Sequence, residues 1–416
     1  MGVPSTAPLA VDAIRRDFPI LEREVGPDTP LVYLDNAATT LTPEPVLDAM
    51  NTYYREYNAN VHRGLHTLSQ EASIAYEEAH DTVADFIGAD GGRAELIFTK
   101  NTTESLNLVA QAWGFANLTP DDEIVITAAE HHSNLVTWQQ VAKRTGATLR
   151  ILEIDETGTF NLEHASEVIG PKTAMVSVLH VSNTLGSILP VEEIGQLARE
   201  VDALFVVDGA QAVPTMPVDV TEIDADFYAF SGHKMLGPTG IGCLYGKESL
   251  LESLDPFLYG GEMIRSVSYD SATWNDLPWK YEAGTPPIAE GIGLAAAVEY
   301  LERIGMDNLH QHEQWVTEYA LERLSELPEI TIYGPDDANE RGGLVSFTMD
   351  GVHAHDIAEM TNEYGVAIRA GHHCTQPLHE TLGVAATSRA SFYCYNTRDE
   401  VDVLVDALDA TLELFS

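Results

Sequence analysis

The chain has 416 residues, of which 44% are hydrophobic, so it is long enough for two domains that each bury a core. Its 22 basic and 65 acidic residues give a net charge of -43, which excludes nucleic acid and anionic membranes as partners because both require a basic surface. The acidic residues are spread along the chain rather than gathered in a tail. This pattern predicts a surface adapted to high salt, where screening weakens self-repulsion, with a basic partner protein as the alternative.

The chain contains three cysteines, Cys243, Cys374 and Cys394, which do not form a disulfide framework. This favours the reducing cytoplasm as its compartment. No apolar run approaches the roughly 20 residues of a membrane span, and no signal peptide is indicated. We therefore expect a cytoplasmic protein that does not enter a membrane.

In the first part of the chain, short apolar runs alternate with amphipathic segments. Such alternation predicts a largely parallel sheet with helices on both faces. The expected helices cover residues 11–24 (broken at Pro19), 43–57, 69–87, 105–113 and 191–201. The expected strands cover residues 31–36, 95–99, 123–127, 148–154, 174–180, 204–208 and 226–231.

After Gly242 the pattern changes to that of a smaller α+β domain. Residues 258–264 and 281–286 are expected to be loops, and residues 288–304 a long apolar helix that bridges two domains. We therefore predict a large domain over residues 31–290 and a small domain built from residues 1–30 and 291–416. Its other expected helices cover residues 312–327, 354–364 and 398–415, and its strands 330–333, 344–348 and 388–392.

The two runs that begin at residues 204 and 226 both end in polar residues and glycine. Parallel sheets bind ligands at the carboxyl ends of their strands, so the polar residues that follow these runs should face one crevice. They are Asp208, Gln211, Ser231, His233 and Lys234. A lysine beside a histidine, with a carboxylate from a neighbouring strand, predicts a Schiff-base lysine for pyridoxal 5'-phosphate (PLP). Most lysines are instead solvated, but only Lys234 follows a buried strand into a Ser-Gly-His turn.

Two further strand ends carry candidate groups. Thr102 and Thr103 follow one strand and begin a helix, where backbone N–H groups, hydroxyls and the helix dipole favour a phosphate. The alternative for each threonine is plain helix capping. His131 follows another strand, and its ring can stack on a flat cofactor.

Several motifs together resemble one family. They are LDNAATT (34–40), NVHRG (60–64), TTE (102–104), EHH (130–132), DGAQ (208–211), SGHK (231–234), AGTP (283–286), RAGHHC (369–374) and NT (396–397). The combination resembles the class V aminotransferase superfamily and, within it, the type II cysteine desulfurases of the SufS kind. It extends from about residue 14 to the end of the chain. The resemblance implies the type I fold of PLP enzymes, with a mostly parallel sheet of seven strands flanked by helices and a smaller α+β domain.

The resemblance also implies residue roles. Lys234 holds PLP covalently and moves protons at the substrate Cα, Asp208 pairs with the ring nitrogen, Gln211 bonds the ring oxygen and His131 stacks on the ring. The implied phosphate ligands are Thr102, Thr103, Ser231, His233 and, from the second subunit of a homodimer with shared active sites, Thr285. The implied substrate-binding residues are Asn183, Arg389, Arg369, His62 and Asn36, and the forked guanidinium of Arg389 suits a carboxylate.

Cys374 is the implied nucleophile. It follows Gly371 in a segment that contains Arg369, His372 and His373, and cationic neighbours favour a thiolate. The alternative for a lone cysteine is an inert buried thiol, which we expect for Cys243 and Cys394. A metal cluster at residues 372–374 is the other alternative, but no second Cys or His lies at finger-like spacing, so we expect no metal.

The expected function is conversion of L-cysteine to L-alanine, with a persulfide left on Cys374. The sulfur then passes to an acceptor or Suf-type assembly protein for iron–sulfur cluster assembly. Two alternatives stay open at this point. One is a selenocysteine lyase or another PLP enzyme of the aminotransferase family, and the other is a non-enzymatic, metal-binding scaffold.

Overall fold

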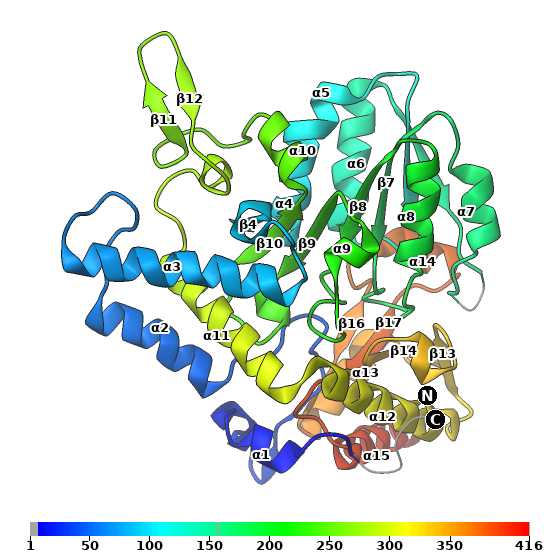
Figure 1. Cartoon of the computed structure of the whole chain (residues 1–416). Coiled ribbons are helices and arrows are strands. Elements are labelled where there is room, and N and C mark those ends of the chain that lie inside the picture. Colours follow the sequence, from blue (N-terminus) through cyan, green and yellow to red (C-terminus); the bar gives the residue numbers. More distant parts are fainter. Residues whose placement is uncertain (1–6, 156–157, 416) are drawn as a thin grey trace.

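The computed structural model of the chain describes residues 7–155 and 158–415. Within these residues, a seven-stranded sheet forms the centre, in the order β4-β10-β9-β8-β7-β5-β6 (Figure 1). β10 runs antiparallel to both of its neighbours and the other pairs are parallel, so the predicted, mostly parallel sheet is confirmed. The strands are β4 (Leu96–Thr99), β5 (Glu123–Thr127), β6 (Thr148–Leu152), β7 (Thr173–Leu179), β8 (Leu204–Asp208), β9 (Phe227–Ser231) and β10 (Gly242–Gly246).

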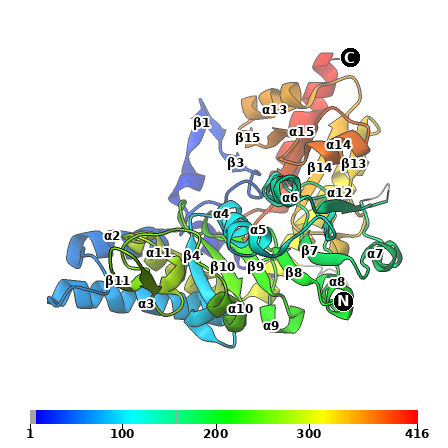
Figure 2. The same ribbon diagram turned by 90° about the horizontal axis from the view of Figure 1, so that it is seen from above.

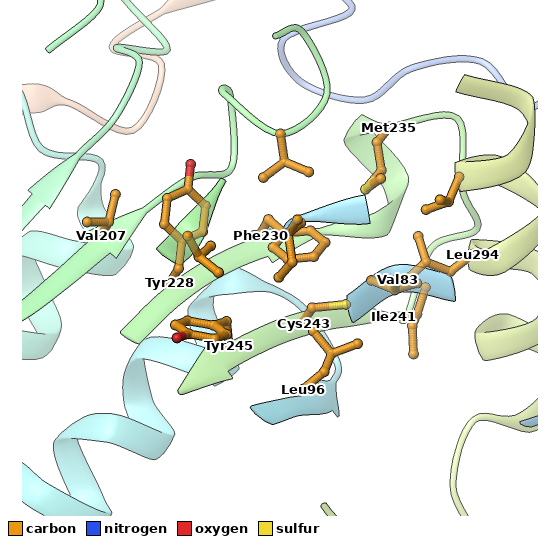
Figure 3. Close-up of a cluster of buried hydrophobic side chains, with 14 of the residues drawn as sticks. Val83, Leu96, Val207, Tyr228, Phe230, Met235, Ile241, Cys243, Tyr245 and Leu294 are labelled. Carbon is orange, nitrogen blue, oxygen red and sulfur yellow. The ribbon is translucent and has the colours of Figure 1, made fainter. Parts of the chain in front are cut away.

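Both faces of this sheet are buried, and successive side chains of a strand point into opposite cores. Val206 belongs to the core under α4 and α6, whereas Val207 belongs to the larger core on the opposite face. Figure 3 shows part of that larger core around Phe230 and Cys243. The flanking helices are α4 (Thr102–Val109), α5 (Phe115–Asn117), α6 (His132–Thr145), α7 (Leu162–Val168), α8 (Val191–Glu200), α9 (Val220–Ile223) and α10 (Glu248–Ser253).

Three long helices lie together beside the sheet (Figure 1). α11 (Ile288–Ile304) packs on both α2 (Glu44–Glu56) and α3 (Thr67–Phe86). It has the bounds that the apolar run predicts, and its small residues allow close approach: a Cβ on Gly291 would lie 2.9 Å from the Tyr76 ring of α3.

The C-terminal elements gather on one side of the large sheet (Figure 1 and Figure 2). Four antiparallel strands in the order β13-β14-β17-β16 pack on helices through a core of their own, which fits the predicted α+β domain. The strands are β13 (Ile330–Tyr333), β14 (Leu344–Met349), β16 (Arg369–Gly371) and β17 (Thr387–Ser391). The helices are α12 (Met306–Ser325), α13 (Ala354–Glu363), α14 (Gln376–Thr381) and α15 (Arg398–Phe415).

The N-terminal segment lies against this second unit. It contains α1 (Val11–Arg15), the paired strands β1 (Glu24–Gly26) and β2 (Thr29–Pro30), and β3 (Val32–Tyr33). β3 pairs in parallel with β15 (Val366–Ala367), so the strand expected over residues 31–36 does not join the large sheet. An apolar run indicates a strand but not its partner. The division of the chain at residue 31 stays a prediction, and residues 1–6 lie outside the described part.

One element that the sequence did not indicate lies between the two expected loops at residues 258–264 and 281–286. β11 (Ile264–Val267) and β12 (Ala272–Trp274) form an antiparallel hairpin that projects at the upper left of Figure 1. Its turn exposes Tyr269 fully, and Val267 is 69% exposed. The sequence lacks an alternating apolar pattern here because neither face of the hairpin is buried in the chain.

Among the helices of the described residues, none combines the length and apolar character that crossing a membrane requires.

Candidate active site

A cavity of about 240 Å³ lies at the carboxyl ends of the parallel strands and reaches to β16 and β17. Ala37 and Ala38 of the small-residue loop after β3 form part of its wall. Most of the site residues predicted from the sequence meet here. Those that line the cavity are Thr102, Thr103, His131, Asn183, Asp208, Gln211, Ser231, His233, Lys234, Arg369, Cys374 and Arg389.

Lys234 ends a single 3₁₀ turn that follows β9, and Asp208 is the last residue of the neighbouring strand β8. Burial lowers the pKa of Lys234 to about 8, and the negative charge of Asp208 opposes that shift. An appreciable fraction of the amine is therefore uncharged near neutral pH, as an amine that attacks a carbonyl must be. Asp208 accepts a hydrogen bond from the Ala210 N–H at 3.0 Å, which fixes its carboxylate at the strand end.

His131 caps the N-terminus of α6. Its Nδ1 accepts the Ser133 N–H at 3.1 Å and lies 2.8 Å from the Ser133 hydroxyl, so in the neutral ring the proton is on Nε2. Burial and the nearby Lys234 lower the pKa of His131 to about 3. The ring is therefore uncharged at neutral pH, which suits stacking on a flat heterocycle.

The turn between β4 and α4 forms a cradle for an anion. The Ser231 hydroxyl accepts the Thr102 N–H at 2.9 Å and shares a hydrogen bond with the Thr102 hydroxyl at 2.7 Å. Gly242 of β10 backs the turn so closely that a Cβ there would lie 2.5 Å from the Cα of Asn101. Hydroxyls and N–H groups at the start of a helix favour a phosphate, as the sequence predicts.

The two arginines of the cavity come from the second unit and share one carboxylate. Nε of Arg369 lies 3.2 Å from Asp35, and Nη2 of Arg389 lies 3.3 Å from the same carboxylate. Nη1 of Arg389 donates to the Asn183 carbonyl at 2.7 Å, while its buried Nε has no partner among the described residues. Burial lowers the pKa of Arg389 to about 10, so it remains a cation at neutral pH. A guanidinium cation at the cavity wall fits a carboxylate ligand. The sequence did not reveal Asp35 as a member of this site.

Cys374 lies in the loop between β16 and α14 and is exposed. The side-chain amide of Asn183 donates to the His373 carbonyl at 2.7 Å, so Asn183 holds this loop in addition to its predicted substrate role. Cys243 and Cys394 are fully buried, and burial raises the pKa of both thiols well above the usual value. Figure 3 shows Cys243 among apolar side chains, as expected for an inert thiol.

Three predicted site residues lie outside the cavity. Thr285 lines a separate cavity with Lys100 and Gly240. The His62 ring packs against Trp279, with 4.2 Å between ring centroids. The buried amide of Asn36 donates to the Ser391 carbonyl at 2.6 Å. The predicted roles of Thr285, His62 and Asn36 stay predictions.

No group of three or more His, Cys, Asp or Glu side chains in residues 7–155 and 158–415 is arranged to hold a metal ion. The two histidines before Cys374 make different contacts: His372 Nε2 lies 2.8 Å from the Ala385 carbonyl, and His373 Nε2 lies 2.9 Å from the Thr387 hydroxyl.

Comparison with known proteins places this site in a family. The family model of class-V aminotransferases matches residues 32–404, and the chain belongs to this family. Its relatives include a cysteine desulfurase of Haloferax volcanii (63% identical) and a probable cysteine desulfurase of Halobacterium salinarum (60%), each covered over 100% of both chains. A solved cysteine desulfurase from Thermococcus onnurineus has a TM-score of 0.92 and 43% identity, over 100% of this chain and 98% of the other. The expected enzyme class and fold are thereby confirmed, and the acidic composition fits the two halophilic relatives. The SufS-like subtype stays a prediction.

Enzymes of this family depend on PLP, and the cavity fits that cofactor. The cradle formed by Thr102 and Ser231 suits its phosphate, and its walls supply an uncharged imidazole, a carboxylate and a lysine with a lowered pKa.

Proposed function

We propose that this enzyme converts L-cysteine to L-alanine and leaves the sulfur as a persulfide on Cys374. The observation that carries the proposal is that Lys234 and Cys374 line one cavity although they come from different units of the fold. A lysine supports chemistry at the substrate Cα, and an exposed thiol opposite it supports attack on the substrate sulfur.

Each wall of the cavity has a role in holding PLP. Lys234 would hold it covalently. Asp208 would face the ring nitrogen, Gln211 the ring oxygen and His131 the ring face. The phosphate would be bound by Thr102, Thr103, Ser231 and His233. When bound, PLP supplies an electron sink next to the substrate Cα.

The substrate is oriented and deprotonated by side chains of the chain. Arg389 lines the cavity and remains a cation at neutral pH, so it binds the substrate carboxylate. Lys234, with a pKa lowered to about 8, takes up the proton from Cα. Asp35 already pairs with both arginines. The incoming carboxylate therefore meets guanidinium groups that are held in place.

The thiolate of Cys374 then attacks the substrate sulfur. The bond between the two sulfur atoms forms as the Cβ–S bond of the substrate breaks, and the electron pair of that bond stays on Cβ, which takes up a proton to become the methyl group of alanine. The substrate carbon is reduced and its sulfur is oxidised to the persulfide level, so no external oxidant or reductant is consumed.

We propose a homodimer in which Thr285 serves the phosphate of the second subunit, because Thr285 lies outside the cavity of its own chain. We propose that the persulfide passes to a Suf-type acceptor for iron–sulfur cluster assembly in the cytoplasm. The exposure of Cys374 supports such a transfer.

The test is to incubate the holoenzyme with ³⁵S-cysteine and locate the label. We expect reductant-sensitive label on Cys374 and one alanine per sulfur. Cys374→Ala should keep the bound cofactor and its absorbance response to cysteine but release no sulfide with added reductant. Full sulfide release by Cys374→Ala would replace the persulfide mechanism with an elimination.

Activity on two substrates, L-cysteine and L-selenocysteine, distinguishes a cysteine desulfurase from the alternative, a selenocysteine lyase. Selenium leaves carbon more readily than sulfur does, so Cys374→Ala should retain activity on L-selenocysteine even where it loses activity on L-cysteine. A wild-type enzyme active on selenocysteine alone would favour the lyase.

A further inference from the structure

The loop that carries the nucleophile has an unusual backbone. His373 and Cys374 both adopt left-handed conformations, with φ of 49° and 60°, directly after Gly371 at φ 125° and His372. Residues with a Cβ disfavour this region, and two in succession persist only where surrounding contacts enforce it. The contacts of this loop therefore determine where the Cys374 thiol lies.

Those contacts come from the large sheet and its helices. The Asn183 amide donates to the His373 carbonyl at 2.7 Å, and the hydroxyls of Thr184 and Thr375 lie 2.9 Å apart. The first residue of α6, His132, donates its backbone N–H to the carbonyl of Cys374 at 2.8 Å.

His132 makes a second contact on the other side of the nucleophile. Its ring Nε2 accepts the backbone N–H of Gln376 at 3.1 Å. One residue thus holds the loop both at Cys374 and two positions beyond it. An acceptor role for Nε2 requires a neutral ring protonated on Nδ1, because imidazolium has no lone pair to offer.

We propose that His132 is a positioning residue for sulfur transfer: its uncharged ring holds the Cys374 loop in the left-handed conformation that presents the thiolate to the substrate sulfur, and protonation of the ring releases the loop. This inference rests on the proposed role of Cys374 as nucleophile. His132 directly follows His131. The start of α6 therefore places the ring expected to stack on the cofactor next to the ring that holds the Cys374 loop.

The surroundings of His132 keep its ring neutral, and so keep the hydrogen bond to the Gln376 N–H, at neutral pH. The titratable groups next to the His132 ring are His131, whose ring centroid lies 6.3 Å away, and His372 on the loop. Cys374 contacts the backbone of His132. Burial and His372 lower the pKa of His132, so its ring stays neutral until the solution is acidified. Loss of sulfur transfer should then appear on the acid side.

The test compares two substitutions. His132→Phe keeps a ring but removes the acceptor, whereas His132→Gln places an amide oxygen near the position of Nε2 and does not titrate. The first measurement is amide hydrogen exchange of the peptide that contains Gln376, in protein without cofactor. We expect faster exchange in His132→Phe and near wild-type exchange in His132→Gln, because only the former leaves the Gln376 N–H without an acceptor.

The second measurement is turnover. For His132→Phe we expect kcat for alanine formation to fall about tenfold, the effect of about one hydrogen bond, with little change in KM or in the absorbance change on cysteine binding. His132→Gln should restore most of kcat and lose the acid decline of the wild type. A merely structural role would lower the melting temperature of both variants without this split.

Two outcomes would overturn the inference: wild-type exchange and kcat in His132→Phe, or an acid decline that persists unchanged in His132→Gln. Failure of the proposed function is distinguishable, because it would appear as full desulfurase activity in Cys374→Ala whatever residue stands at position 132.

Discussion

Asp35 lies 3.3 Å from Arg389, the arginine that we expect to bind the substrate carboxylate. It also lies 3.2 Å from Arg369, so one carboxylate orients two cations at the cavity wall. This arrangement satisfies one edge of the Arg389 guanidinium and leaves its Nε without a partner among the described residues. The side chain is therefore held in place before the substrate arrives, which lowers the cost of binding.

Arg389→Lys should raise KM for cysteine about 10- to 100-fold, because a lysine cannot keep the contacts to Asn183 and Asp35 and still offer a donor to the substrate. Steady-state kinetics of alanine formation will measure this. Arg369→Lys is the matched control and should have a smaller effect, because Arg369 is far more exposed. An unchanged KM in Arg389→Lys would remove Arg389 from the substrate site.

Attachment of PLP to the apoprotein should become faster as the pH rises toward about 8 and level off above it. The reason is that Lys234, whose pKa burial lowers to about 8, must be uncharged to attack the aldehyde. Stopped-flow absorbance after mixing with PLP gives the profile. Asp208→Asn should shift the midpoint to lower pH, because it removes a charge that favours the ammonium form. A midpoint near the ordinary lysine value of about 10.4 would contradict the burial argument.

For Lys234→Ala we expect no covalent attachment and no turnover, although PLP can still bind through the phosphate cradle. Borohydride should fix the cofactor to the wild type and not to the variant. Equal fixation on both proteins would assign the covalent bond to another lysine.

Cys243→Ala and Cys394→Ala should each cost about 1 kcal/mol of unfolding free energy and leave desulfuration near the wild-type rate. Both thiols are fully buried in packed cores, so removing the sulfur leaves a small cavity. Denaturant titration at fixed high salt measures the loss. Cys374→Ala makes the opposite control, with activity lost and stability kept. Strong inhibition by either buried substitution at unchanged stability would mean that the thiol takes part in the reaction.

The melting temperature should rise from dilute buffer to molar KCl, because a net charge of -43 destabilises the compact chain when it is unscreened. Tetramethylammonium chloride at equal ionic strength should act in the same direction if screening is the cause. A flat or falling curve would remove the high-salt interpretation of the composition.

Sequence patterns predicted best where local signals and burial agree. The helices at residues 288–304 and 398–415 have the predicted bounds, since long apolar periodicity and the preceding proline or polar start mark them clearly. The residues after β8 and β9 converge because strands of a parallel sheet end at one edge. Contacts between distant segments leave no local pattern in the sequence. Hydrophobic periodicity could therefore not predict the pairing of Asp35 with the arginines, the contact of His132 with the Cys374 loop, or the pairing of β3 with β15. The hairpin β11–β12 was missed because its faces are exposed.

Gly242 has a consequence for how this sequence tolerates change. It contributes no chemical group, yet the first atom of any side chain would press on the backbone of Asn101, which begins the anion cradle. Variation at position 242 should therefore be restricted to a single amino acid, as at a catalytic position. Gly242→Ala should yield a folded protein that loses its cofactor readily on dialysis. In a survey of natural or random variants, substitutions at this strand position should therefore abolish activity as often as substitutions of catalytic residues do.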